Sequence, residues 1–177
     1  MSAGATGSAP ILLHGARLTL RRAGEVDLPA LMSVLESPDV VQWWGRSDVE
    51  QLGNDVRGGS VDVVLVIEVD SQTAGLIQYH EENEPNYRHA GLDICLAPQW
   101  QARGLGAEAL RTLARYLFEE RGHHRLTIDP AVTNHRAIAC YRAVGFQPVG
   151  VMRRYERGPD GSWHDGLLMD LLREELR

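Results

Sequence analysis

Gln101–Gly106 reads QARGLG, and it separates two stretches with different hydrophobic periodicity. Arg88–Leu96 before it alternates like a strand, and Pro98 closes that strand. Gly106–Arg121 after it carries apolar residues at helical spacing, and Gly122 follows at the helix end. A glycine turn that opens a helix allows close backbone approach and offers free N–H groups, which suits a pyrophosphate.

The same turn has a second interpretation as a dinucleotide-binding motif. Gly104–Ala109 fits the pattern G-x-G-x-x-G/A, and Asp129 follows at a suitable distance. However, Pro98–Arg103 separates the glycines from the strand, and there is no second βαβ half to complete such a site. We therefore favour another phosphate-bearing ligand.

Outward from the turn, the periodicity predicts an α/β (α+β) domain with one mixed sheet. About six to seven strands and about four helices are expected to pack together. Residues 1–14 are expected to form a flexible tail, residues 15–177 a single domain, and Thr133 an N-cap. The strands are expected over 17–21, 61–69, 73–80, 88–96, 124–128, 146–155 and 162–172, and the helices over 28–35, 49–56, 106–121 and 133–143.

The composition limits which partners, cellular compartment and metal can be expected. The 177 residues carry 24 acidic and 18 basic side chains, and the formal net charge of -6 favours a cationic partner over nucleic acid. Two cysteines cannot build a disulfide framework, so we expect a reducing, cytoplasmic location. The start lacks signal-peptide features, and the longest apolar run, Val63–Ile67, is too short to cross a membrane. The seven histidines show no ligand spacing, so no metal is expected.

Asp129–Phe146, which reads DPAVTNHRAIACYRAVGF, is the most informative stretch. Tyr141 follows Asn134 by seven residues, which places both on one face of a helix. Together with the turn at Gln101–Gly106, this pattern resembles the GNAT superfamily of acetyl-CoA-dependent N-acetyltransferases. The similarity extends over residues 17–172 and implies a mostly antiparallel sheet that splays at the fourth strand.

Within that superfamily, the Asp-Pro pair and Asn-x-Arg-Ala-Ile-x-Cys-Tyr resemble the aminoglycoside 6'-N-acetyltransferases. Gly91-Leu92-Asp93 and Trp43-Trp44-Gly45 are similar to the same subgroup. The opening at Arg17–Arg22 also resembles acetyltransferases that act on ribosomal-protein N-termini. The loop over 79–88 is shorter than in the better-known aminoglycoside enzymes and lacks their tryptophans.

The resemblance implies how acetyl-CoA is bound. The strand at Ile94–Leu96 pairs its backbone with the pantetheine arm, and the glycine turn holds the pyrophosphate. Asn134 hydrogen-bonds the pantetheine amide, although a helix cap is the alternative for this residue. The expected coenzyme-binding residues are Ile94, Cys95, Leu96, Gln101, Arg103, Gly104, Leu105, Gly106, Ala107, Asn134 and Ala137.

Asp93 and Tyr141 are the expected catalytic residues. An aspartate among apolar strand residues is costly unless it is paired or used, so Asp93 is a candidate to deprotonate the substrate ammonium. Its alternative is a pair with a nearby arginine or backbone group. The resemblance assigns the Tyr141 hydroxyl to the leaving thiolate, with a core aromatic as the alternative. We expect Cys140 to be a small buried thiol and not a nucleophile. Adjacent helical residues point about 100° apart, so Cys140 does not face the same way as Tyr141.

Glu81, Glu82 and Asp129 are expected to make an acidic mouth for the acceptor, and Trp43 and Trp44 are expected to give it a flat aromatic wall. The alternatives are a merely solvated acidic loop and core packing of at least one tryptophan. The expected substrate-binding residues are Trp43, Trp44, Tyr79, Glu81, Glu82, Asp93 and Asp129.

These features predict acetyl transfer from acetyl-CoA to the 6'-amine of an aminoglycoside by direct attack in a ternary complex. A peptide N-terminus or a small amine is the alternative acceptor. An acyl-CoA sensor without turnover is the third possibility. Neither nucleic acid nor a membrane is an expected partner, and the protein is expected to be a monomer or a homodimer.

Overall fold

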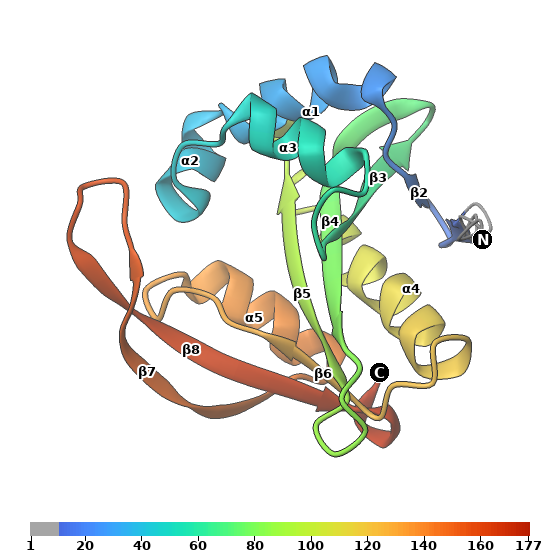
Figure 1. Ribbon diagram of the computed structural model, residues 1–177, viewed down its shortest axis with the longest axis vertical. Coiled ribbons are helices and arrows are strands. Elements are labelled where there is room, and N and C mark those ends of the chain that lie inside the picture. Colours follow the sequence, from blue (N-terminus) through green and yellow to red (C-terminus); the bar gives the residue numbers. More distant parts are fainter. Residues whose placement is uncertain (1–10) are drawn as a thin grey trace, which may run out of the picture.

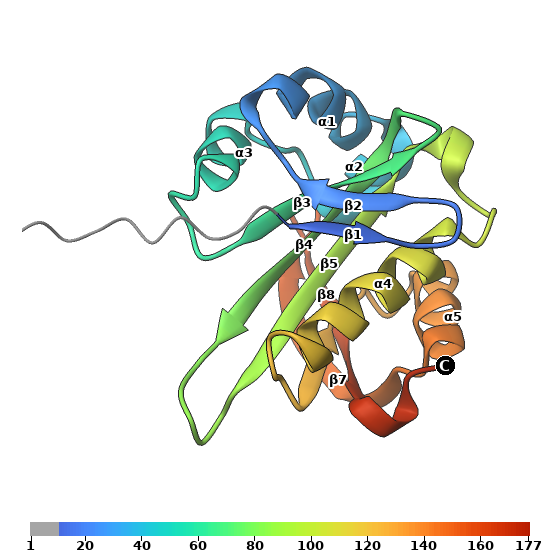
Figure 2. The same ribbon diagram turned by 90° about the vertical axis from the view of Figure 1, so that its right-hand side faces the viewer.

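A single mixed sheet organises the computed structural model, which describes residues 11–177 (Figures 1 and 2). Its eight strands lie in the order β1-β2-β3-β4-β5-β6-β8-β7, and every pair except β5 with β6 is antiparallel. The strands are β1 (Leu12–His14), β2 (Thr19–Arg22), β3 (Val63–Val69), β4 (Gln72–Glu82), β5 (His89–Leu96), β6 (Arg125–Ile128), β7 (Gln147–Arg157) and β8 (Trp163–Leu172).

Helices cover both faces of the sheet (Figure 2). Along β3, Val64 and Val66 pack with the first three helices, whereas Leu65 and Ile67 pack on the opposite face with α4. This alternation follows from the two-residue period of a strand. The helices are α1 (Leu28–Leu35), α2 (Pro38–Trp44), α3 (Val49–Val56), α4 (Leu105–Glu119) and α5 (His135–Val144).

The sheet opens between β5 and β6, and this opening positions the site. β5 continues to Leu96, but only Ala90 and Gly91 pair with β6. Beyond Gly91 the two strands diverge, and α5 lies on the β6 side of the gap (Figure 1). The expected splay at the fourth predicted strand, which is β5 here, is confirmed, as is the mostly antiparallel α+β architecture.

Two elements were not predicted, so the counts differ from those expected. Leu12–His14 pairs with β2 as β1, which corrects the expected tail over 1–14 for its last part. Residues 1–10 of that expected tail lie outside the described residues. The second addition is α2, which begins at Pro38, three residues after the end of α1. Proline has no N–H and suits the first helical position, so it begins α2 as well as ending α1.

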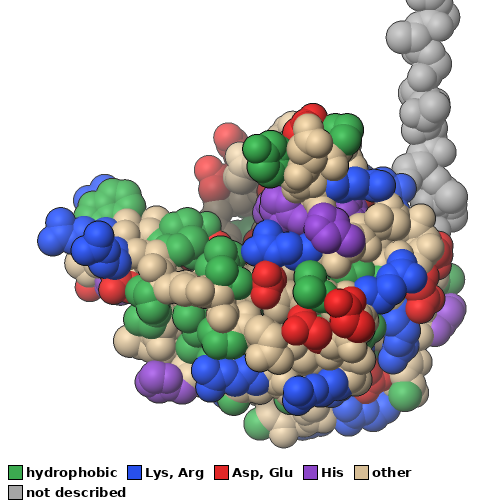
Figure 3. Space-filling view, turned by 90° about the horizontal axis from the view of Figure 1, so that it is seen from below, with side chains coloured by type: hydrophobic (Ala, Val, Ile, Leu, Met, Phe, Trp, Pro, Cys, Tyr) green, Lys and Arg blue, Asp and Glu red, His purple; other side chains and the backbone are tan. Residues whose placement is uncertain are grey.

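The outer strand β7 is largely exposed. Val149 is 53% exposed, Val151 57% and Trp163, across the hairpin on β8, 59%. Viewed from below, hydrophobic side chains gather along the projecting ribbon and basic ones cluster at its tip (Figure 3). None of the described helices is long and apolar enough to cross a membrane.

Candidate active site

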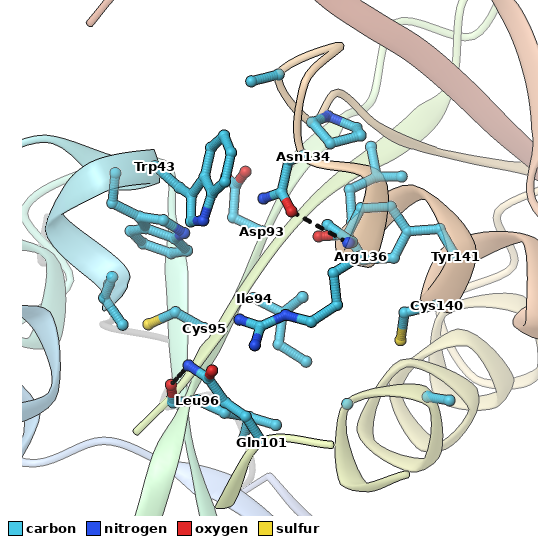
Figure 4. A pocket seen from close by; sticks show the side chains of 18 of the residues that line it. Trp43, Asp93, Ile94, Cys95, Leu96, Gln101, Asn134, Arg136, Cys140 and Tyr141 are labelled. Atoms are coloured by element: carbon cyan, nitrogen blue, oxygen red, sulfur yellow. Dashed lines mark hydrogen bonds between the residues drawn. The ribbon is translucent and has the colours of Figure 1, made fainter. Parts of the chain in front are cut away.

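A cleft of about 650 Å³ opens where β5 and β6 diverge (Figure 4). Its walls are β5 with Gln78 of the adjacent β4, the turn before α4 and the start of that helix, the end of β6 and the segment after it, α5, α2, and Glu156 of β7. It therefore brings together residues from distant parts of the chain. The sequence-predicted residues that line it are Trp43, Trp44, Asp93, Ile94, Cys95, Leu96, Gln101, Gly104, Gly106, Ala107, Asp129, Asn134, Ala137 and Tyr141.

The edge of β5 presents free backbone groups to this cleft. The Ala97 N–H donates to the Ala74 carbonyl of the β4 side, so alternate residues along β5 direct their N–H and C=O groups toward the gap. Ile94 and Leu96 are such residues, and the Gln101 side chain takes the Leu96 carbonyl at 2.7 Å. The backbone of Cys95 faces β4, so this residue contributes to the cleft through its side chain.

The glycine turn delivers the N-terminus of α4 to the same cleft. Gly104 has a φ of 78°, a left-handed conformation that favours glycine. The first-turn N–H groups of an α-helix have no intrahelical partner, so Gly106 and Ala107 offer donors at the cleft wall. Two predicted residues lie outside the lining: Leu105 is buried in the core, and the Arg103 guanidinium lies 5.3 Å from the centre of the Trp100 ring.

Arg17 fixes the turn from a distant part of the sequence. Its backbone N–H and Nε donate to the two carboxylate oxygens of Glu108 at 2.6 and 2.8 Å. Its Nη1 donates to the Arg103 carbonyl at 2.8 Å. Although burial opposes it, these hydrogen bonds hold the pKa of Glu108 below its usual value. The β1–β2 turn is thereby tied to the first turn of α4.

Asp93 lies on β5 and lines the cleft. Gln78 is directly opposite on β4, and its Nε2 donates to Asp93 Oδ2 at 3.3 Å. Burial raises the pKa of Asp93; the Gln78 amide opposes this, and the negative charge of Asp129 adds to it. His80 lowers the pKa and Asp62 raises it by weaker charge effects. No described arginine pairs with Asp93, so its carboxylate is available to a ligand.

Tyr141 projects from α5 into the cleft from the opposite side. Its ring is 7% exposed and packs against Phe146 at a centroid distance of 6.1 Å. Burial raises the pKa of Tyr141 well above its usual value, so its hydroxyl remains protonated. That hydroxyl makes no hydrogen bond to any other residue among 11–177. The core-aromatic and cleft-lining interpretations therefore both describe part of its environment.

The start of α5 combines a cap with a cleft contact. Asn134, rather than Thr133, is the N-cap, and its Oδ1 accepts from the Ala137 N–H at 3.1 Å. Its side-chain NH₂ makes no hydrogen bond to another described residue. Cys140 also lines the cleft, but burial raises the pKa of its thiol, which disfavours a nucleophilic thiolate.

The cleft also holds carboxylates that the sequence patterns did not single out. Asp39 comes from α2 and Glu156 from β7, and they join Asp93 and Asp129 in lining the cleft. Burial and the charge of Asp129 raise the pKa of Glu156. No sequence signal identified them, because α2 was not predicted and Glu156 lies on a strand far from the motifs.

A distortion in β7 directs Tyr155 toward the cleft. The register with β8 shifts between Met152 and Glu156, where Arg154 takes a φ of 51°. The Tyr155 ring lies against Gly166, where a Cβ would stand only 2.9 Å from the ring. The Tyr155 hydroxyl donates to Asp129 at 2.5 Å. This hydrogen bond, together with burial, raises the pKa of Tyr155 to about 12.

Three predicted substrate residues lie elsewhere. Tyr79 is 3% exposed and packs edge-on against Tyr116, so it belongs to the core. Glu81 accepts two hydrogen bonds from Arg121, at 3.0 and 2.8 Å, and lies 2.7 Å from His123 Nε2. Glu82 hydrogen-bonds the Glu84 N–H within its own turn. None of the three lines the cleft.

A strand edge with free amides, a helix N-terminus and a protonated tyrosine suit a group-transfer enzyme that binds a long, phosphate-bearing thioester. The chain belongs to the GNAT acetyltransferase family, because the family described as "Acetyltransferase (GNAT) domain" matches residues 17–147. The protein is therefore an acetyl-CoA-dependent GNAT N-acetyltransferase.

Individual relatives act on different amines. The chain is 30% identical over 164 residues to an aminoglycoside N(6')-acetyltransferase type 1 of Klebsiella pneumoniae, covering 81% of this chain and 79% of that protein. It is 27% identical over 111 residues to a spermidine N(1)-acetyltransferase of Escherichia coli, covering 63% of this chain and 59% of that protein. A solved structure of AAC(6')-Ib with paromomycin and acetyl-CoA superimposes with a TM-score of 0.74 at 25% identity, covering 90% of this chain and 95% of that one.

Proposed function

We propose that this enzyme transfers the acetyl group of acetyl-CoA to the 6'-amine of an aminoglycoside, in the cytoplasm. The observation that carries the proposal is the set of four carboxylates in the cleft, Asp39, Asp93, Asp129 and Glu156, none of which forms an ion pair with another described residue. A polycationic acceptor would supply the missing positive charges.

The residues of the cleft fit acetyl-CoA as co-substrate. The free backbone groups of Ile94 would hold the pantetheine amides, and the free amide of Asn134 would hold the same arm from the other wall. The N–H groups of Gly106 and Ala107 would bind the pyrophosphate. The co-substrate supplies an activated acetyl group, so no covalent enzyme intermediate is needed when both substrates are held together.

Asp93 would hold the ammonium of the acceptor and accept one proton from it, which leaves a neutral nucleophile. Because its pKa is raised, the Asp93 carboxylate is a stronger base than an ordinary aspartate. As the nitrogen bonds to the acetyl carbon and the carbon–sulfur bond breaks, Tyr141 would donate its proton to the sulfur. The tyrosinate then regains the second proton released by the nitrogen, through water.

Trp43 and Trp44 favour a cyclic acceptor over a linear one. Both indoles line the cleft from the end of α2, and Trp43 faces the same space as Asp93 (Figure 4). Flat aromatic side chains pack well against sugar rings, whereas a linear polyamine needs only carboxylates. A linear polyamine is nevertheless the second candidate, because the four carboxylates would bind it equally well.

The test is release of free thiol from acetyl-CoA with a panel of acceptors: kanamycin, tobramycin, spermidine and N-terminal peptides. The proposal predicts release with the two aminoglycosides, and mass spectrometry that places one acetyl group on the 6'-nitrogen. Release only with spermidine or peptides would retain the enzyme class and replace the acceptor. Tight acetyl-CoA binding without release for any acceptor would instead support a sensor.

A further inference from the structure

Charge is unevenly distributed in the cleft. Among the described residues that line it, Arg136 is the only cation, whereas four carboxylates line it as well. Arg136 nevertheless forms no ion pair with any residue among 11–177. A guanidinium that shares a cleft with four carboxylates and pairs with none must lie in a separate part of it.

Figure 4 shows where that part is. The Arg136 side chain leaves the start of α5 and crosses the gap, so that its guanidinium lies over Ile94 and faces Gln101 on the opposite wall. The N-terminus of α4 borders the same space, since the Sγ of Cys140 is 3.6 Å from where a Cβ on Gly106 would stand. Arg136 therefore faces the glycine turn and not the carboxylates.

Helix stability does not explain this cation. Arg136 is in the first turn of α5, which contains no acidic residue. The helix dipole disfavours a positive charge at a helix N-terminus. The side chain is also exposed, so it contributes little packing. A cation in an unfavourable position, without a partner and aimed into a cleft, is consistent with binding of an anion.

Arg103, which was among the expected coenzyme-binding residues, does not fill this role. Arg103 belongs to the glycine turn, but its guanidinium lies over Trp100, outside the cleft lining. The positive charges of Arg111 and Arg136 both favour a lower pKa of the Cys140 thiol, in opposition to burial. There is therefore positive potential between α4 and α5. The groove thus has helix N–H donors on one wall and a guanidinium on the other.

We propose that Arg136 binds a phosphate group of coenzyme A from the wall opposite the glycine turn, and so clamps the nucleotide end of the co-substrate. This inference rests on the proposed coenzyme-binding mode of the cleft. The phosphate is either part of the diphosphate or the 3'-phosphate of the ribose, because both present the same chemistry to a guanidinium.

The experiment measures binding of CoA, dephospho-CoA and pantetheine by calorimetry to the wild type, Arg136→Gln and Arg142→Gln. Arg142 lies on the same helix, is exposed and does not line the cleft, which makes it a matched control. Arg136→Gln is expected to weaken CoA binding by about tenfold, as for loss of a charge-assisted hydrogen bond. Pantetheine binding is expected not to change, because pantetheine lacks all three phosphates. Arg142→Gln is expected to bind all three ligands like the wild type.

The dephospho-CoA arm distinguishes the two phosphates. If Arg136 contacts the 3'-phosphate, the variant and the wild type bind dephospho-CoA equally; if it contacts the diphosphate, the tenfold difference persists. The melting temperature of the ligand-free variant is expected to be unchanged or slightly higher, since a cation leaves a helix N-terminus. Equal CoA affinity in Arg136→Gln and the wild type would overturn the proposal, as would an equal loss for pantetheine. Failure of the wild type itself to bind CoA would contradict the proposed function instead.

Discussion

Two groups of acidic residues that look alike in the sequence have different environments. Glu81, at the end of β4, is neutralised by Arg121 and His123 and lies outside the cleft. Asp93 and Asp129 line the cleft and pair with no cation among the described residues. The acidity of a segment therefore does not indicate a cation-binding site until the partners of each carboxylate are known. The cleft carboxylates Asp93 and Asp129 (the cleft group) should govern activity, whereas Glu81 and its ion pairs (the Glu81 group) should govern stability.

The largest expected effect comes from the cleft group. Asp93→Asn removes the base while keeping the size and most hydrogen bonds of the side chain. We expect kcat/KM for the acceptor to fall on the order of a hundredfold, in the range of general-base catalysis. Steady-state rates measure kcat/KM, and calorimetric binding of CoA measures the affinity for the coenzyme separately. A variant with wild-type rate and pH profile would remove Asp93 from the mechanism.

Tyr141→Phe tests the opposite wall of the cleft. The ring and its packing on Phe146 remain, but the proton donor for the leaving thiolate is lost. We expect kcat to fall by about ten- to a hundredfold, the lower part of the range for general-acid catalysis, while CoA affinity is retained. An unchanged kcat in Tyr141→Phe would mean that Tyr141 is only a core aromatic.

Asp129→Asn tests whether the cleft carboxylates influence one another. Loss of a carboxylate that faces the acceptor is expected to raise the acceptor KM by about tenfold. The negative charge of Asp129 raises the pKa of Asp93, so its removal lowers that pKa. The acid limb of the kcat profile should therefore move to lower pH. A shift toward higher pH, or none, would show that Asp129 does not act on Asp93.

Glu81→Gln is the matched test on the other group and has the smallest expected effect on activity. We expect kcat/KM to remain at the wild-type value, with a loss of stability on the order of 1 kcal/mol near neutral pH. The pKa of Glu81 is held below its usual value in the folded state, so this stabilisation is present above the unfolded-state pKa and is lost as pH falls through the folded-state pKa. Thermal unfolding of both proteins at neutral and acidic pH measures this.

For that stability test, the difference in melting temperature should shrink in acid. A difference that grew as the pH fell would contradict the assigned ion pair. A large loss of acceptor affinity in Glu81→Gln would return Glu81 to the acceptor site and remove the distinction between the two groups.

Local patterns predicted the parts of the site that depend on backbone conformation. The glycine turn, α4, and the shared helix face of Asn134 and Tyr141 follow from spacing, and the structure has all of them in the predicted places. The strand predicted over Arg88–Leu96 is likewise present as β5, where Asp93 and Cys95 lie two residues apart on one face.

Side-chain partners were less accessible from the sequence. Arg103 was expected to bind the coenzyme, but its side chain lies over Trp100, and Arg136 from another helix faces the groove. Glu156 lines the cleft at the end of the distortion in β7, and the neighbouring Tyr155 ring packs where β8 carries Gly166. Such contacts depend on how distant elements pack, and periodicity along the chain contains no information about that packing.

The most direct test of the central claim uses two aminoglycosides that differ only in an amine or a hydroxyl at the 6' position. Initial rates of thiol release and the position of the acetyl group are measured for each, with the hydroxyl compound also tested as an inhibitor. We expect acetylation of the amine compound at the 6'-nitrogen, and competitive inhibition without turnover by the hydroxyl compound. Equal turnover of both compounds, with acetyl on another nitrogen, or no binding of either, would contradict it.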